Sequence, residues 1–348
     1  MREDNFRKVI PYTPGEQPGG RVIKLNTNEC PYPPSPYVVR ALTEMDPDRL
    51  RLYPDPLCTR FIKALSSYYK VPENMIFAGV GSDDVLSMCF MTYFNSGREI
   101  LFPDITYSFY DVWADVYRVP YKTVPLLDDF SLDVEGFKAG NGGVIIANPN
   151  APTGRLEKTE TIEEILKANN DSVVIVDEAY IDFGGESALP LIFKYDNLIV
   201  VRTLSKSRAL AGMRLGYAFG NEKLIKYLND VKFSVNSYTL NTPSILAGEA
   251  AIEDDAYFKE IRDKVIKVRE ETKQSLKEMG FEFCDSMTNF IFAKKQGMDA
   301  KAVFEKLKER NIYVRYFNKP RINEYLRISI GTDEEMKTFI KALKEILE

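Results

Sequence analysis

The chain has 348 residues, of which 45% are hydrophobic and 28% are charged, and its formal net charge is -5. This length and composition predict a soluble globular protein of two domains, and the acidic balance argues against a general nucleic-acid binder. The sequence contains no histidine, which excludes Ser-His-Asp and Cys-His catalysis and imidazole metal ligands. Any chemistry must therefore use lysine, tyrosine, carboxylates or a cofactor.

The sequence also argues against a membrane or secreted protein. No apolar run approaches the ~20 residues of a membrane span, and the first residues lack the apolar stretch of a signal peptide. The four cysteines lie far apart, with no pair at metal-ligand spacing. We therefore predict a cytoplasmic protein without a metal site and without a membrane or nucleic-acid partner.

The first 35 residues are rich in Pro, Gly and Asn, and predict an extended arm with one short strand at 22–25. Helices are expected after Ser35, which can cap the first of them, and over 57–69. From residue 75 onward, short apolar runs alternate with helical stretches, which indicates βα units and a mainly parallel sheet covered on both faces. The expected strands are 75–78, 99–102, 144–147, 173–176, 198–201 and 215–219, with helices up to residue 94, at 106–117 and at 159–169.

The pattern changes after about residue 240. The expected helices are 242–252, 256–279, 299–310 and 333–347, and the expected strands are 281–284, 290–293, 313–315 and 325–330. Strands with helices on one face suggest a smaller α+β domain, which the N-terminal arm joins. We therefore predict a large domain over 36–240 and a small domain formed by 1–35 and 241–348.

Several polar or glycine-rich groups follow directly after predicted strands. Because ligands gather at the carboxyl ends of parallel strands, we expect these groups to share one site. The groups are 79–84, 103–107, 148–154, 177–180 and 203–206.

Lys206 lies among small and hydroxylated residues, with Arg214 eight positions further on. A lysine can form a Schiff base with the aldehyde of pyridoxal phosphate, while Ser205 and Arg214 can hold the phosphate of this cofactor. The alternative is a surface lysine at the end of a strand. The other strand ends decide between these interpretations.

Two other strand ends match further parts of a pyridoxal-phosphate site. The turn with Ser82 and Asp83 precedes a helix, whose backbone N–H groups can bind a phosphate, although a simple capped turn gives the same pattern. Asp177 ends a buried strand, where a carboxylate is destabilising without a cation, and a protonated pyridine nitrogen is such a cation. Capping of the next turn is the alternative role. Tyr180 can reach the phenolic oxygen of the cofactor.

Three more positions are candidates. Tyr107 can stack on the pyridine ring, with core packing as the rival role. The turn 148–154 can offer a side-chain amide to the ring oxygen. Arg327, a cation within an apolar strand, can bind a substrate carboxylate through two hydrogen bonds, and a strand arginine that faces solvent is the alternative.

Together these stretches resemble the fold-type-I pyridoxal-phosphate-dependent aminotransferases with the class II lysine motif. The similarity runs from Pro11-Tyr12 through 51–55 to 326–332, and within this group the chain is similar to the histidinol-phosphate aminotransferases. The resemblance implies an α/β fold whose large domain has a mainly parallel seven-stranded sheet between helices. It also implies the reaction of L-histidinol phosphate with 2-oxoglutarate to give imidazole acetol phosphate and L-glutamate.

The resemblance implies roles for the matching residues. Lys206 is the Schiff-base lysine and proton carrier, Asp177 pairs with the pyridine nitrogen, and Tyr180 binds the ring oxygen. The remaining expected cofactor contacts are Tyr107 on the ring face, Ser82, Asp83, Ser205 and Arg214 around the phosphate, and Asn150 as a candidate for the ring oxygen.

The resemblance also implies a homodimer with shared sites, in which Tyr53 reaches the cofactor phosphate of the neighbouring subunit. Arg327 is expected to hold the α-carboxylate of the dicarboxylate partner. Arg315 and Tyr12 are expected at the phosphate end of histidinol phosphate, with Asn28 nearby.

One position departs from the family pattern. The family usually has Asn before the Pro-Thr-Gly turn, and this chain has Ala151. Asn148, Asn150 or Tyr180 alone remain the candidates for the contact with the ring oxygen.

Other functions on the same scaffold also stay open. An aromatic amino-acid aminotransferase and a threonine-phosphate decarboxylase are enzyme alternatives, and Arg321 can take the part of Arg315 in binding a phosphate. A non-catalytic regulator that binds pyridoxal phosphate is the alternative of another class.

Overall fold

The computed structural model describes residues 5–138 and 140–348. Its largest element is a seven-stranded sheet of order β2-β8-β7-β6-β5-β3-β4, in which only β8 runs antiparallel to its neighbours. The prediction of a mainly parallel seven-stranded sheet is confirmed. The strands are β2 (Ile76–Val80), β3 (Ile100–Pro103), β4 (Tyr121–Val124), β5 (Gly143–Ala147), β6 (Val174–Asp177), β7 (Leu198–Thr203) and β8 (Leu215–Gly220).

The central strands are buried on both faces because their sequences are continuous apolar, β-branched runs. Successive side chains point to opposite faces of a strand. Accordingly, Val174 and Val176 of β6 join one hydrophobic core, and Ile175 between them joins the other. The strand sequences therefore specify a sheet that needs helices on both sides.

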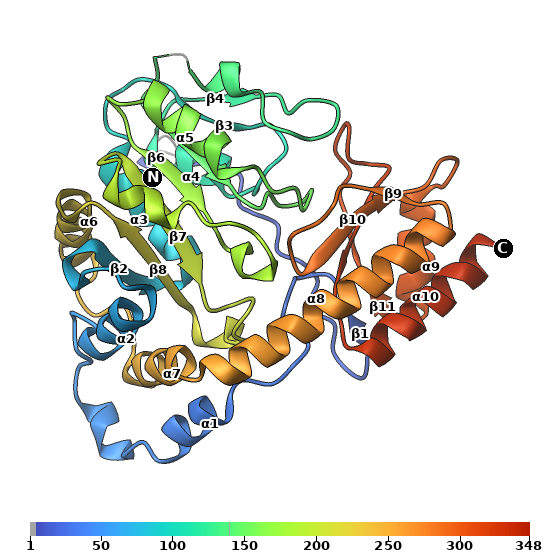
Figure 1. The fold of residues 1–348 in the computed structure, drawn as a ribbon, viewed down its shortest axis with the longest axis horizontal. Helices are drawn as coiled ribbons and strands as arrows, with labels where there is room; N and C mark the ends of the chain where they lie inside the picture. The colour runs from blue at the N-terminus through green and yellow to red at the C-terminus, as the bar shows by residue number, and fades with distance from the viewer. Residues whose placement is uncertain (1–4, 139) are drawn as a thin grey trace.

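Helices cover the two faces of the sheet (Figure 1). Side chains of α2, α5 and α7 join the core on one face, and side chains of α3, α4 and α6 join the core on the other. The helices are α1 (Pro36–Thr43), α2 (Thr59–Tyr69), α3 (Gly81–Tyr93), α4 (Tyr110–Tyr117), α5 (Thr159–Ala168), α6 (Glu222–Val235) and α7 (Thr242–Glu253). Ser35 caps α1 as predicted, since its side chain accepts a hydrogen bond from the backbone N–H of Val38.

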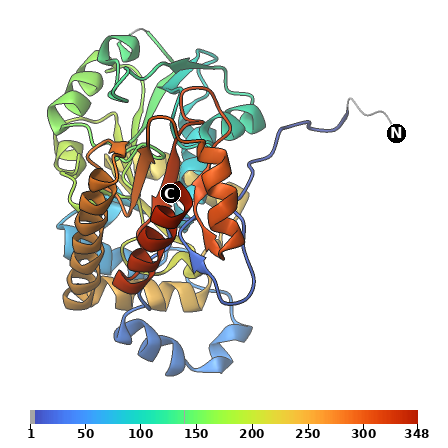
Figure 2. The ribbon, with the colours of Figure 1, turned by 90° about the vertical axis from the view of Figure 1, so that its right-hand side faces the viewer.

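A second, antiparallel sheet of order β12-β13-β10-β9 lies beside the first (Figure 1). It forms its own core with three helices and with Leu25 of the N-terminal arm. Figure 2 shows the arm continuing away from the body of the molecule toward the N-terminus. The elements are β9 (Glu282–Phe283), β10 (Phe290–Lys294), β12 (Arg315–Tyr316), β13 (Leu326–Ser329), α8 (Asp255–Glu278), α9 (Ala300–Glu309) and α10 (Asp333–Leu347).

The division of the chain at residue 240 stays a prediction. Helix α7 follows that residue but packs against α1 and α2 beside the large sheet. Helix α8 follows α7 and runs along the molecule to the small sheet (Figure 1).

Three local features differ from the sequence-based expectations. The expected strand at 313–315 is split, because β11 (Ile312–Tyr313) pairs with β1 (Ile23–Lys24) whereas β12 pairs with β13. Strand β4 and helix α6 were not predicted. Three of the four residues of β4 are exposed at the edge of the sheet, so this strand lacks an apolar run.

Among the described residues, none of the helices combines the length and the apolar composition needed to cross a lipid bilayer.

Candidate active site

A cavity of about 210 Å³ lies where the carboxyl ends of β6 and β7 face the N-terminal arm and the small sheet. It brings together residues from all these parts of the chain. The predicted site residues that line it are Tyr12, Asn28, Ser82, Asp83, Tyr107, Asp177, Tyr180, Ser205, Lys206, Arg214, Arg315 and Arg327.

Two predicted site residues do not line the cavity. The side chain of Tyr53 is 82% exposed, and its ring stacks on that of Tyr238 with centroids 4.7 Å apart. Asn150 is buried behind the cavity wall, and its side chain is used in hydrogen bonds within the protein.

One corner of the cavity is suited to bind a phosphate. Arg214 Nη2 lies 3.0 Å from Asp83 Oδ2, at the first turn of α3, where backbone N–H groups have no partner within the helix. A Cβ on Gly81 would lie 2.6 Å from Arg214 Nη2, and Gly81 has φ +80°. Glycine at this position therefore allows the guanidinium to lie directly against the start of the helix.

The same corner is closed by neighbouring hydroxyl groups. Ser205 Oγ lies 2.8 Å from Thr203 Oγ1, whose single proton can go either to Ser205 or to the backbone oxygen of Leu215 at 3.1 Å. When it goes to Ser205, the proton of the Ser205 hydroxyl is left for another acceptor. The Tyr107 hydroxyl donates to Asp83 Oδ1 at 2.8 Å and so fixes the tyrosine ring at the cavity wall. Donors from three segments thus surround one position.

Asp177 is buried at the end of β6 and takes part in no ion pair among the described residues. Its two oxygens accept hydrogen bonds from the backbone N–H of Ala179 and from the hydroxyl of Tyr110, each 3.1 Å long. Burial outweighs these bonds and raises the pKa of Asp177 to about 6. A cationic group of a ligand would stabilise this carboxylate.

Lys206 projects into the cavity from the loop after β7. Its Nζ donates to the backbone oxygen of Thr27 at 3.3 Å and lies 5.8 Å from the centroid of the Tyr180 ring. The Tyr180 hydroxyl accepts a hydrogen bond of 2.9 Å from Asn28 Nδ2, so its own proton is free for a ligand. The N-terminal arm therefore supports both the lysine and the tyrosine.

The structure limits the candidates for the hydrogen bond to the ring oxygen of the cofactor, a contact for which Ala151 has no suitable side chain. Asn150 donates to the backbone oxygen of Ile105 and accepts from Thr106, and Asn148 both donates to and accepts from the backbone of Glu157. Neither amide is free to turn toward the cavity. The Tyr180 hydroxyl has the necessary freedom.

Arg315 and Arg327 occupy directly paired positions of β12 and β13, and both line the cavity. Neither forms an ion pair among residues 5–138 and 140–348; they donate instead to backbone oxygens of the arm. Burial and the charge of Arg315 lower the pKa of Arg327, whose Nε has no hydrogen-bond partner. Two unneutralised guanidinium groups side by side form a site for anions.

Arg321, the alternative to Arg315, does not line the cavity. It forms an ion pair with Asp104 at 2.9 Å and donates to the backbone oxygens of Leu126 and Leu127. The structure therefore gives Arg321 a role in joining the two sheets.

The sequence-based search missed several residues of the site. Asn26, Thr27 and Glu29 line the cavity, and Tyr110 bonds to Asp177 from outside it. The polar stretch around Asn28 was the available signal for the first three. No sequence signal distinguishes Tyr110 from the other tyrosines, of which the chain has 20 in all.

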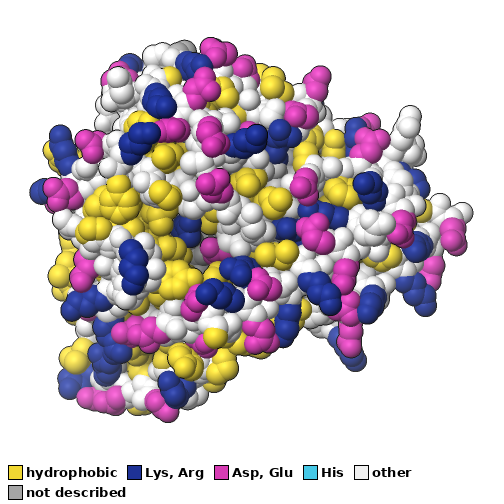
Figure 3. Space-filling view, viewed as in Figure 1, with side chains coloured by type: hydrophobic (Ala, Val, Ile, Leu, Met, Phe, Trp, Pro, Cys, Tyr) yellow, Lys and Arg dark blue, Asp and Glu magenta, His cyan; other side chains and the backbone are white. Residues whose placement is uncertain are grey.

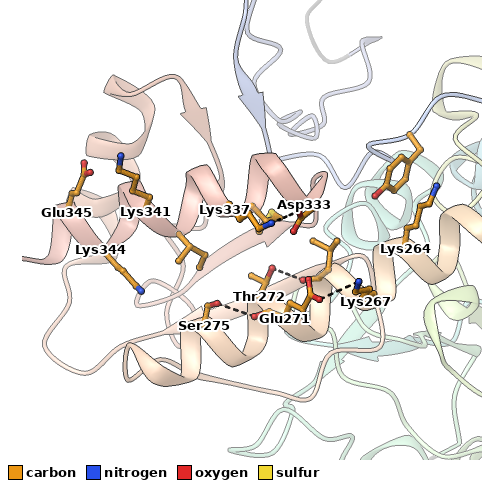
Figure 4. Close-up of a pocket in the computed structure, with 14 residues that line it drawn as sticks. Lys264, Lys267, Glu271, Thr272, Ser275, Asp333, Lys337, Lys341, Lys344 and Glu345 are labelled. Atoms are coloured by element: carbon orange, nitrogen blue, oxygen red, sulfur yellow. Dashed lines mark hydrogen bonds and ion pairs between the residues drawn. The ribbon is translucent and has the colours of Figure 1, made fainter.

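A larger hollow of about 950 Å³ lies between α8 and α10 (Figure 4). It contains none of the predicted site residues. Two lysines on its rim are paired with acids of the same helix, Lys267 with Glu271 and Lys337 with Asp333. The predicted site residues gather in the smaller cavity instead.

The pKa of Asp177 gives a prediction for the ligand-free protein. Its folded value of about 6 exceeds the ordinary value of about 3.9, so ionisation destabilises the folded state as pH rises between these values. We expect Asp177→Asn to raise the free energy of unfolding at pH 8 by on the order of 2–3 kcal/mol, and to leave it nearly unchanged near pH 4. Urea unfolding at both pH values measures this difference.

Asp171→Asn is the control, because Asp171 is 62% exposed in a surface ion pair with Arg98. We expect the free energy of unfolding of Asp171→Asn to differ little from that of the wild type at either pH. An equal effect of Asp177→Asn at the two pH values would contradict the assigned cause.

Comparison with known proteins places the chain in a family. Residues 20–343 match the family described as aminotransferase class I and II. The chain is 52% identical over 347 residues to histidinol-phosphate aminotransferase of Brachyspira hyodysenteriae, covering 99% of this chain and 98% of that protein. It is 50% identical over 347 residues to histidinol-phosphate aminotransferase of Lactococcus lactis subsp. cremoris, with the same coverage.

A solved structure agrees with this assignment. Histidinol-phosphate aminotransferase from Sinorhizobium meliloti, solved in complex with pyridoxal-5'-phosphate, superimposes with a TM-score of 0.86 at 26% identity. The match covers 94% of this chain and 90% of that one. The fold, the site and the sequence similarity agree: the chain belongs to the class I and II aminotransferase family.

Proposed function

We propose that this chain is a pyridoxal-phosphate-dependent aminotransferase that converts L-histidinol phosphate and 2-oxoglutarate to imidazole acetol phosphate and L-glutamate. One observation carries the proposal: the amine of Lys206, the buried carboxylate of Asp177 and the Arg214 corner open on one cavity. The relatives named histidinol-phosphate aminotransferase support the substrate.

The residues present fit this cofactor. Gly81 leaves room for Arg214 against the first turn of α3, where Ser82, Asp83 and Ser205 complete a phosphate site. Asp177 lacks a cation among the described residues, and a protonated pyridine nitrogen supplies one. Tyr107 and Tyr180 line the cavity; Tyr107 would stack on the ring face, and the Tyr180 hydroxyl would donate to the ring oxygen.

When bound, the cofactor supplies an electron sink that weakens the C–H bond at the carbon bearing the amino group. Lys206 Nζ would hold the cofactor and would carry the proton to and from that carbon. Asp177 would keep the ring nitrogen protonated, which the electron sink requires. The hydrogen bonds from Tyr110 and from the Ala179 backbone hold the carboxylate in place for this task.

The arginine pair fits the anionic substrates of both half-reactions. Arg327 is proposed to bind the carboxylate of the 2-oxo acid, and Arg315 with Tyr12 to bind the phosphate of histidinol phosphate. Tyr12 is held over the cavity by its ring, which stacks on Phe109 with centroids 4.1 Å apart. Because the whole chain is acidic, these local cations must supply the attraction for anions.

Side-by-side turnover of histidinol phosphate, phenylalanine and threonine phosphate, each with 2-oxoglutarate, tests this function. We expect kcat/KM for histidinol phosphate to be the highest of the three. Phenylalanine lacks the phosphate that Arg315 is proposed to bind, and the relatives of this chain are named for histidinol phosphate and not for threonine phosphate. Lys206→Ala should lower turnover by at least 10³-fold, on the order of what a covalent and proton-carrying residue contributes. A negligible wild-type rate with histidinol phosphate would exclude the proposed substrate.

The active form is proposed to be a homodimer in which Tyr53 completes the phosphate site of the neighbouring subunit. Tyr53 and its surroundings are apolar yet exposed, with Leu50, Leu52 and Leu57 between 56% and 63% exposed. Figure 3 shows hydrophobic side chains gathered over the region of α2 and α6. An exposed apolar surface of this kind is typical of a subunit interface. The cytoplasmic location stays a prediction.

Light scattering should give a mass of twice the 39.8 kDa of one chain. Tyr53→Phe should keep this mass and weaken cofactor binding by about 3- to 10-fold, because one hydrogen bond to the phosphate is lost. Tyr37→Phe is the control, since Tyr37 is also exposed and has no proposed contact with the cofactor. A monomer that is fully active would refute the shared site.

A further inference from the structure

Three carboxylates line the cavity, and they differ in how their oxygens are used. Asp83 accepts hydrogen bonds from Tyr107 and Arg214, one at each oxygen. Asp177 likewise uses both oxygens, as described above. Glu29 is different, because both of its hydrogen bonds within the protein go to Oε2.

Glu29 Oε2 accepts from Thr27 Oγ1 at 2.8 Å and forms an ion pair with Lys24. Glu29 Oε1 has no hydrogen-bond partner within the described part of the chain, and the side chain is 41% exposed. Burial opposes ionisation of Glu29, but the bonds from Lys24 and Thr27 outweigh burial and lower its pKa. The cavity therefore contains an ionised, fixed carboxylate with one open oxygen.

Glu29 lines the same cavity as Lys206, the proposed catalytic lysine. Lys206 is near enough for its charge to favour the ionised form of Glu29, and its Nζ donates to the backbone of Thr27, two residues away. The arginine pair lines the same cavity. An ionised carboxylate oxygen can only accept hydrogen bonds. A ligand with an N–H donor would therefore bind favourably to Glu29, although the rest of the cavity is suited to anions.

We propose that Glu29 determines specificity for the amino substrate, with Oε1 accepting a hydrogen bond from an N–H of its imidazole ring. This inference rests on the proposed function and specifies that Glu29 binds the imidazole end of the substrate. The imidazole carries one N–H when neutral and two when protonated, and both forms serve as the donor. The phosphate at the other end is left to Arg315.

The open carboxylate also explains discrimination among the three rival substrates. Phenylalanine has an apolar ring that would displace water from Glu29 without replacing its hydrogen bond. The loss of that hydrogen bond disfavours binding of phenylalanine. Threonine phosphate has no ring N–H donor and would leave Glu29 Oε1 without a hydrogen bond. The second substrate, 2-oxoglutarate, has no N–H donor, and its half-reaction should therefore not depend on Glu29.

The test compares wild-type holoenzyme with Glu29→Met, which removes the acceptor at similar length. We expect kcat/KM for histidinol phosphate to fall by about 10- to 100-fold, mainly through KM, as for loss of a hydrogen bond to a charged group. The value for phenylalanine should be unchanged or higher, and KM for 2-oxoglutarate should stay within about twofold. Glu29→Gln keeps a neutral acceptor and should recover part of the loss.

Both amino substrates are assayed on the same preparation, so any loss of folded enzyme cancels in their ratio. Glu16→Met is the matched control, because Glu16 lies on the same arm but pairs with Lys308 outside the cavity. Its substrate ratio should equal that of the wild type.

An equal fall for histidinol phosphate and phenylalanine in Glu29→Met would show a structural role and overturn the inference. An unchanged ratio with an active wild type would also overturn it, while leaving the proposed function intact. Absence of wild-type turnover of histidinol phosphate would instead contradict the proposed function itself.

Discussion

The buried carboxylate of Asp177 is the constraint around which this site is arranged. It lies at the end of β6, where the register pairs it with Ala147 of β5 and Val201 of β7. Those neighbours are apolar, so the sheet itself cannot neutralise the charge, and burial raises the pKa of the carboxyl group. The hydrogen bonds from Ala179 and Tyr110 do not offset this burial, and a ligand with a cationic group at this position would stabilise the ionised form further.

The other parts of the site take their places from the same edge of the sheet. Lys206 follows β7, and Arg214 directly precedes β8, which returns antiparallel beside β7. Gly216 of β8 lies so close to the start of α3 that a Cβ there would be 2.2 Å from the carbonyl carbon of Gly81. This close approach brings the arginine and the helix N-terminus to one phosphate-sized position. The small sheet contributes Arg315 and Arg327 to the cavity, and the arm contributes Glu29.

Much of this arrangement could be predicted because it depends on local sequence and on one topological rule. Asp177, Lys206 and the turn before α3 each follow an apolar run, and parallel strands bring their carboxyl ends to one edge. Arg327 was recognisable as a charge in an apolar strand. The alternation of strands and helices gave the fold for the same reason.

The remaining features depend on contacts between distant parts of the chain. Thr27 and Glu29 reach the cavity because two contacts hold the arm in place: β1 pairs with β11, and Asn28 bonds to Ser329 of the small sheet. No local pattern encodes a contact across 301 residues. The exposure of Tyr53 could likewise not be predicted from the local sequence, because its proposed contact lies on a second subunit.

The central claim is that Lys206 binds the cofactor in this cavity. Borohydride reduction of the holoenzyme, followed by digestion and mass spectrometry of the peptides, tests it directly. The account predicts one phosphopyridoxyl group per chain, attached to Lys206, and no labelling of Lys206→Ala at another lysine. Attachment of the group to a different lysine, or recovery of an unmodified Lys206 peptide from fully active enzyme, would contradict it.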